Sequence, residues 1–65
     1  MAAGLSRREI DVLRLLLRRS TDKEIAEALS ISPRTVMHHV MSILSKLNLA
    51  NRREAAEWAK EHNFE

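Results

Sequence analysis

The feature that most constrains this chain is one stretch, residues 32–47, whose apolar residues repeat with the period of an α-helix. Ser32 can cap a helix start by accepting a backbone N–H, and Pro33 suits the first helical position, where no N–H is needed. The apolar residues recur every three or four positions and so fall on one side of a helix. They are Val36, Val40, Ile43, Leu44 and Leu47. We therefore expect one long helix over residues 33–47 that buries this side.

The opposite side of this helix is polar and free of acid. It carries Arg34, His38, Met41, Ser42 and Ser45. A helix that needs only solubility usually mixes charges of both signs. No Asp or Glu lies between Ala28 and Arg53, so the middle of the chain is basic although the net charge is only +2. Local asymmetry of this kind indicates a polyanionic partner.

The remaining helices are predicted from their capping residues. Ser6 with Glu9, and Thr21 with Glu24, form the S/T-x-x-E capping box, and Asn51 can cap a last helix. We expect helices over about 6–18, 22–29 and 52–61 in addition to 33–47. The predicted fold is all-α, a four-helix bundle containing a helix-turn-helix. Residues 1–4 are expected to be disordered or a cloning junction, and residues 63–65 a frayed end.

Length and composition narrow the class of protein. Sixty-five residues make one small domain, expected to be a module of a longer protein. The absence of Cys excludes disulfides and thiolate metal sites, and His38 and His39 are adjacent and cannot share a helix face. We expect no metal, no cofactor and no catalysis, because no nucleophile–base pair or Gly-rich phosphate loop is present. No apolar run approaches membrane-spanning length, and the absence of Cys fits the reducing cytoplasm in which we expect the domain to act.

Four segments resemble the DNA-binding domain of LuxR-type (NarL/FixJ-type) bacterial transcription regulators. Residues 5–15 resemble the opening pattern L-T-x-R-E-x-x-V-L-x-L, and residues 23–32 resemble K-E-I-A-x-x-L-x-I-S. Residues 35–47 resemble T-V-x-x-H-x-x-x-I-x-x-K-L, and residues 52–56 resemble R-x-E-A-A. Four weak patterns in the right order and spacing make a strong match, which covers residues 5–62.

The resemblance implies a response-regulator output domain at the bacterial nucleoid. Its third helix would enter the major groove of double-stranded DNA, and homodimers meeting through the last helix would bind two half-sites. RNA polymerase is a further partner that the resemblance allows. Two family glycines are replaced: Arg19 stands before the second helix, whose preceding helix must therefore close in another way, and Asn48 suits the same left-handed conformation as Gly.

The helical wheel puts His38, Met41 and Ser42 on the outward side, whereas Met37 lies near the core edge and is assigned, like the dimer interface, only by the resemblance. The residues expected to read bases are Met37, His38, Met41 and Ser42. Those expected to contact phosphates are Thr21, Lys23, Ser32, Arg34, Thr35, Ser45 and Lys46. The predicted dimer interface consists of Ala55, Trp58 and Ala59. Met37 and Met41 stand where the family often has lysine, so this chain is expected to read different bases or to read them weakly.

Two other functions stay open at this point. A helical protein-interaction module could dock a partner through Met37, Met41 and Trp58. A sigma-factor-like promoter-reading domain has a similar opening, although the T-V-x-x-H spacing favours the LuxR type. Salt separates DNA binding from apolar docking, because contacts to several phosphates weaken steeply as salt is added.

Overall fold

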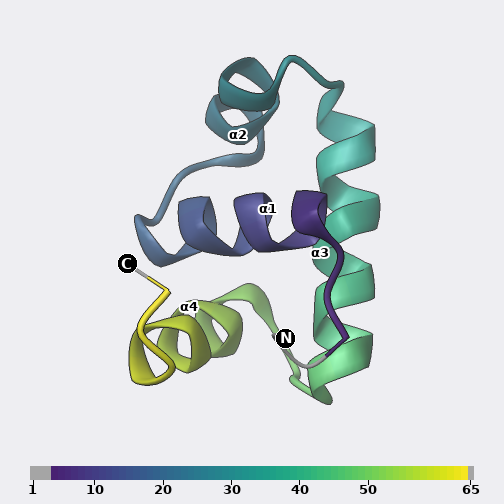
Figure 1. Ribbon diagram of the computed structural model, residues 1–65. Coiled ribbons are helices and arrows are strands. Elements are labelled where there is room, and N and C mark those ends of the chain that lie inside the picture. Colours follow the sequence, from purple (N-terminus) through teal and green to yellow (C-terminus); the bar gives the residue numbers. More distant parts are fainter. Residues whose placement is uncertain (1–3, 65) are drawn as a thin grey trace.

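The computed structural model describes residues 4–64, which form four helices in an all-α fold. The helices are α1 (Arg7–Leu17), α2 (Asp22–Leu29), α3 (Pro33–Leu47) and α4 (Arg52–Glu61) (Figure 1). The predicted bounds of the last three helices are confirmed, and α1 is one residue shorter at each end than predicted. The all-α bundle with a helix-turn-helix, formed by α2 and α3, is confirmed.

Each helix begins where a side chain accepts a backbone N–H of its first turn. The two capping boxes are complete: the Glu9 N–H donates to Ser6 Oγ at 3.2 Å and the Ser6 N–H to Glu9 Oε1 at 2.8 Å. The reciprocal pair between Thr21 and Glu24 has distances of 2.7 and 3.1 Å. Ser32 and Asn51 cap α3 and α4 in the same way. These contacts span only three residues, which explains why the sequence predicts the helix starts well.

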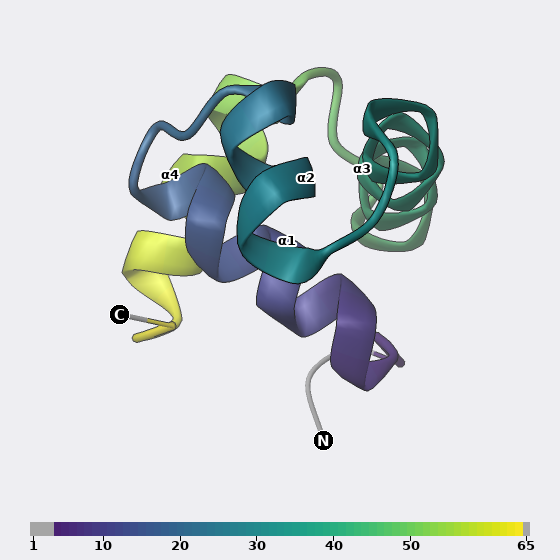
Figure 2. The same cartoon turned by 90° about the horizontal axis from the view of Figure 1, so that it is seen from above.

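The long helix α3 stands along one side of the molecule, and α1 runs at a steep angle to it, with its N-terminal end beside α3 (Figure 1). Helix α1 packs against both α3 and α4, while α2 packs against α3. Seen from above, α3 is viewed almost along its axis and projects to one side of the other three helices (Figure 2). Residues from every helix, and Leu5 before them, bury their side chains in one core: Leu5, Val12, Leu13, Leu16, Ile25, Ala26, Val36, Val40, Ile43, Ala55 and Ala59.

The helix ends close through left-handed residues. Asn48 has φ 56°, as its predicted role requires, and the Leu49 N–H donates to the Leu44 carbonyl at 2.9 Å. Arg19, standing at the position where the family has glycine, adopts φ 61° itself. The N–H groups of Arg19 and Ser20 then donate to the carbonyls of Leu16 and Leu15 at 2.9 and 3.1 Å. This is a Schellman motif built without glycine, at the steric cost of a Cβ in the left-handed region.

The chain beyond α4 folds back on the helix. The Phe64 N–H donates to the Ala59 carbonyl at 2.9 Å, and the Phe64 ring lies 5.4 Å from the Trp58 ring. Fraying of residues 63–65 stays a prediction, and Glu65 lies outside the described residues, as do residues 1–3. Over residues 4–64, no helix is both long and apolar enough to cross a membrane.

Candidate nucleic-acid interface

The outward face of α3 carries two exposed methionines and an exposed histidine. Met37 is 48% exposed and Met41 61% exposed, and among residues 4–64 they are the large apolar side chains left open to solvent. His38 lies between them in sequence and is exposed as well. A methionine can pack on a thymine methyl group, and a histidine can donate to or accept from a base edge. Three of the four residues predicted to read bases thus share an accessible surface.

Ser42, the fourth, is half-buried and hydrogen-bonded within the domain. Its hydroxyl donates to Oε2 of Glu9 on α1. Lys46, predicted to contact phosphate, makes an ion pair with the same carboxylate, with 2.7 Å between Nζ and Oε1. The side chain of Glu9 is only 6% exposed, so this cluster of Glu9, Ser42 and Lys46 joins α1 to α3 from inside the domain. Ser42 and Lys46 therefore help to position α3, whatever else they contact.

The Glu9 carboxylate stays ionised despite its burial. Burial by itself would raise its pKa, but hydrogen bonds from Lys46, Ser42 and the Ser6 backbone, together with the Lys46 charge, outweigh that effect. The pKa of Glu9 falls from 4.5 to about 2. The sequence pattern predicts Glu9 only as part of a capping box. Its second role depends on residues more than thirty positions away, for which local spacing holds no signal.

The residues predicted to contact phosphate divide into two groups. Lys23, Arg34 and Ser45 are exposed, and no ion pair involves either cation within residues 4–64. The hydroxyls of Thr21, Ser32 and Thr35 are already engaged at helix starts, where the Ser32 and Thr35 oxygens lie 2.9 Å apart. A capping hydroxyl can still accept or donate a second hydrogen bond.

The predicted dimer interface on α4 lies partly inside the protomer. Ala55 and Ala59 have 0% exposure because their side of α4 packs against α1, so they are core residues rather than an accessible surface. Trp58 is half-buried and stacks on His62, with 3.9 Å between ring centroids and 16° between planes. Of the three residues, only Trp58 keeps exposed surface through which a second copy could be contacted.

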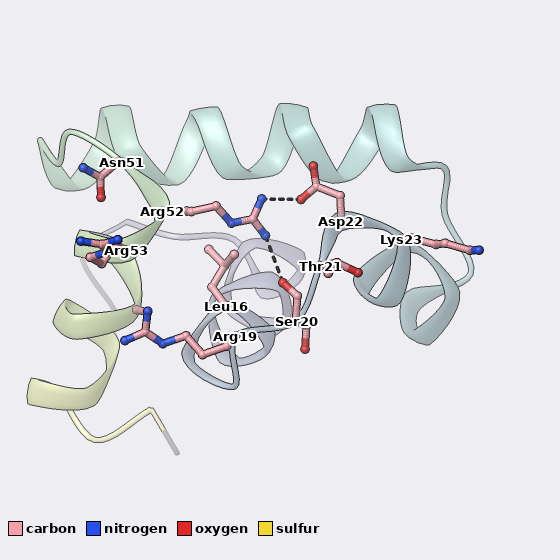
Figure 3. A pocket seen from close by; sticks show the side chains of 10 residues that line it. Leu16, Arg19, Ser20, Thr21, Asp22, Lys23, Asn51, Arg52 and Arg53 are labelled. Carbon is pink, nitrogen blue, oxygen red and sulfur yellow. Dashed lines mark hydrogen bonds and ion pairs between the residues drawn. The ribbon is translucent and has the colours of Figure 1, made fainter.

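A cleft of about 900 Å³ opens between the starts of α2 and α4. Figure 3 shows Arg52 reaching across it: its guanidinium donates to Asp22 Oδ1 at 2.7 Å and to the Ser20 carbonyl at 3.1 Å. Arg19 and Arg53 also line the cleft. The cleft has no signature in the sequence, because it joins residues about thirty positions apart. Within residues 4–64, no group of three or more His, Cys, Asp or Glu side chains is arranged to hold a metal ion.

The sequence of this chain matches a known protein family and several bacterial regulatory proteins. A family described as "Bacterial regulatory proteins, luxR family" matches residues 3–59. An uncharacterized transcriptional regulatory protein of Bacillus subtilis, YhcZ, is 48% identical over 60 residues, which cover 92% of this chain and 28% of YhcZ. The transcriptional regulatory protein LiaR of the same organism is 41% identical over 61 residues, 94% of this chain and 29% of LiaR.

The response regulator protein VraR of Staphylococcus aureus is also similar, with 41% identity over 60 residues that cover 92% of this chain and 29% of VraR. The chain thus spans less than a third of the length of each of these relatives.

Proposed function

Because the chain belongs to the luxR family of bacterial regulatory proteins, we propose that it binds double-stranded DNA as the output domain of a transcription regulator. The relatives that it resembles along most of its own length are transcriptional regulatory and response regulator proteins. We propose that α3 enters the major groove and that the mechanism is non-catalytic: cations and hydroxyls seat the domain on phosphates while α3 reads bases. Such a domain would act at the nucleoid in the cytoplasm.

The observation that carries this proposal is the exposed face of α3. Helix α3 exposes Met37, His38 and Met41 to solvent and contains no acidic residue. Exposed methionines lower solubility, so they indicate a binding surface. Without acidic residues, this surface can approach the edges of DNA bases. Lys23, at the start of α2, and Arg34, at the start of α3, supply cations for flanking phosphates. We infer a reading set of Met37, His38 and Met41, with Ser42 and Lys46 contributing chiefly through the position of α3.

The assembly would be a homodimer on two half-sites, with contact through the outer side of α4. Trp58 is the remaining candidate of the predicted interface, since Ala55 and Ala59 face α1. Contact with RNA polymerase is proposed on the resemblance alone. The half-buried aromatic surface of Trp58 is small, so dimerisation is expected to depend on DNA for the isolated domain.

The test is an amide NMR titration of the labelled domain with a mixed-sequence duplex at low and at physiological salt. We expect shifts in Thr21–Lys23 and across the exposed face of α3 that shrink as salt is added. Met41→Glu places an acid on the exposed face without changing the core. We expect this variant to lose DNA binding while its amide spectrum remains that of a folded domain. Amides that remain unmoved at low salt with excess duplex would refute the proposal.

The same exposed methionines favour a second candidate, a protein-docking surface formed by Met37, Met41 and Trp58. In the structure the two methionines lie on α3 and Trp58 on α4, where it is covered in part by His62 and Phe64. Apolar docking would be insensitive to added salt, so a binding partner whose affinity survives high salt and is lost in Met41→Glu would support it.

A further inference from the structure

We propose that the cleft between the starts of α2 and α4 binds the DNA backbone and extends the contact surface beyond the helix-turn-helix. This inference rests on the proposed function, because it assigns an additional surface to the same partner. The cleft is lined by Leu16, Arg19, Ser20, Thr21, Asp22, Lys23, Asn51, Arg52, Arg53 and Ala56. Four of these residues are cations and one is an acid, so the lining carries a clear surplus of positive charge.

The acids around the cleft already have partners inside the domain. Asp22 is paired with Arg52 at 2.7 Å. Glu24 accepts the Thr21 N–H at 2.7 Å, and Glu54 accepts the Ala50 N–H at 2.8 Å. By contrast, none of the ion pairs within residues 4–64 involves the other three cations of the lining, Arg19, Lys23 and Arg53. The hydrogen bonds leave the charges of Glu24 and Glu54 in place, but neither acid lines the cleft, so its lining keeps three cations without an ion pair in the described part of the chain, the electrostatic complement of a phosphate chain.

The backbone at the cleft adds to these charges. The side chains of Thr21 and Asn51 cap α2 and α4, and each accepts only the N–H of the third residue of its helix. The preceding first-turn N–H groups, those of Asp22, Lys23, Arg52 and Arg53, have no intrahelical acceptor. Two helix starts thus border one cleft, with Thr21 and Lys23 on one side and Asn51 to Arg53 on the other; the Lys23 amine points outward, away from Arg52 (Figure 3).

The cleft is continuous with the proposed DNA-binding surface beside α3, so DNA is the ligand that we infer for it. Thr21 and Lys23 line the cleft and also belong to the residues proposed to contact phosphates beside α3. A strand that leaves the groove read by α3 and passes the start of α2 would lie beside the cleft that Arg53 and Arg19 also line. Arg52 contributes differently, since its guanidinium is held by Asp22 and Ser20 and so keeps the two helix starts together. Phosphate contacts of this kind raise affinity without reading sequence.

The experiment compares the salt dependence of duplex binding for the wild type, Arg53→Gln and Arg19→Gln. Arg14→Gln is the matched control, because Arg14 is an exposed arginine of α1 outside the cleft, and its replacement changes the net charge by the same amount. Fluorescence anisotropy with a labelled mixed-sequence duplex gives the slope of log K against log salt between about 50 and 200 mM. Circular dichroism confirms that each variant is folded.

We expect each cleft variant to reduce the magnitude of the slope by about 0.9, the value for one phosphate contact, while Arg14→Gln keeps the wild-type slope. The loss should be the same for duplexes of different sequence, because phosphates carry no sequence information. If the wild type binds duplex and both cleft variants share its slope, this inference is overturned and the DNA-binding function stands. If the wild type does not bind duplex at low salt, the proposed function itself fails.

Poly-glutamate serves as a second probe of the cleft. We expect poly-glutamate to compete with duplex only weakly, because its carboxylates do not follow the spacing of a phosphate backbone. If Arg53→Gln lost poly-glutamate binding while its slope with duplex stayed at the wild-type value, the cleft would belong to an acidic protein segment, and the proposal for DNA would be wrong.

Discussion

Replacing Glu9 by Gln should show how far one buried carboxylate stabilises this domain. The change keeps the size of the side chain, and Gln can still complete the capping box with Ser6. It removes the negative charge that binds Lys46, and it replaces one acceptor oxygen by an amide. The variant therefore removes the charge from the contact between α1 and α3 while it keeps the packing of the side chain.

The magnitude follows from the pKa of Glu9. A fall from 4.5 to about 2 corresponds to roughly 3 kcal/mol of stabilisation of the folded state at neutral pH, at about 1.36 kcal/mol per pKa unit. Lys46 is 41% exposed, so water screens part of this attraction, and we expect a loss of about 2 kcal/mol in Glu9→Gln. A domain of 65 residues has a total free energy of unfolding of roughly 3–10 kcal/mol, so the loss is a large fraction of it.

The sign of the pH dependence is determined by the direction of the shift. Because the folded-state pKa is lowered, the contribution of Glu9 is complete above the unfolded pKa of 4.5 and is lost as the pH falls toward about 2. Wild type and Glu9→Gln should therefore differ most at pH 5 to 7. Their free energies of unfolding should converge in acid.

Urea unfolding followed by circular dichroism, repeated from pH 7 down to about pH 2, measures the difference in free energy of unfolding between wild type and Glu9→Gln. Glu57→Gln is the control, because Glu57 is an exposed acid of α4, and its replacement should change the free energy of unfolding by less than about 0.5 kcal/mol. A constant difference between wild type and Glu9→Gln from neutral pH to acid would refute the reasoning, since it would mean that the loss comes from packing and not from charge.

Three further substitutions test other parts of the structure. Arg19→Gly should stabilise the domain by about 0.5–1 kcal/mol and raise Tm by a few degrees, because glycine adopts the φ of 61° without steric cost; an unchanged or lower Tm would contradict this. Ile43→Ala removes a fully buried side chain and should cost about 2–5 kcal/mol in urea unfolding, and a loss below 1 kcal/mol would show that the core is looser than described. Arg52→Gln breaks the ion pair with Asp22. Because the Arg52 side chain is 43% exposed and that of Asp22 39% exposed, thermal unfolding should show a loss of at most about 1 kcal/mol in the free energy of unfolding.

The prediction of the helices from sequence succeeded because their limits depend on neighbours three or four residues apart. Ser6, Thr21, Ser32 and Asn51 each accept an N–H from the third residue of the helix that follows. Such contacts involve only residues close together in the sequence, so their pattern can be recognised without knowing how the helices pack. The exposed face of α3 was predictable for the same reason, since the period of a helix separates Met41 from the buried Ile43.

The sequence by itself therefore determined the four helices, their caps and the exposure of His38 and Met41 on α3. Only the tertiary structure decided that Glu9 holds Ser42 and Lys46, 33 and 37 residues away, and that Arg52 bridges to Asp22, 30 residues away. It also decided that the stripe of Ala55 and Ala59 is covered by α1, because an apolar stripe has the same pattern whether its own chain or a second copy covers it. Local spacing sets the conformation of the backbone, whereas the partners of a side chain depend on how whole helices pack.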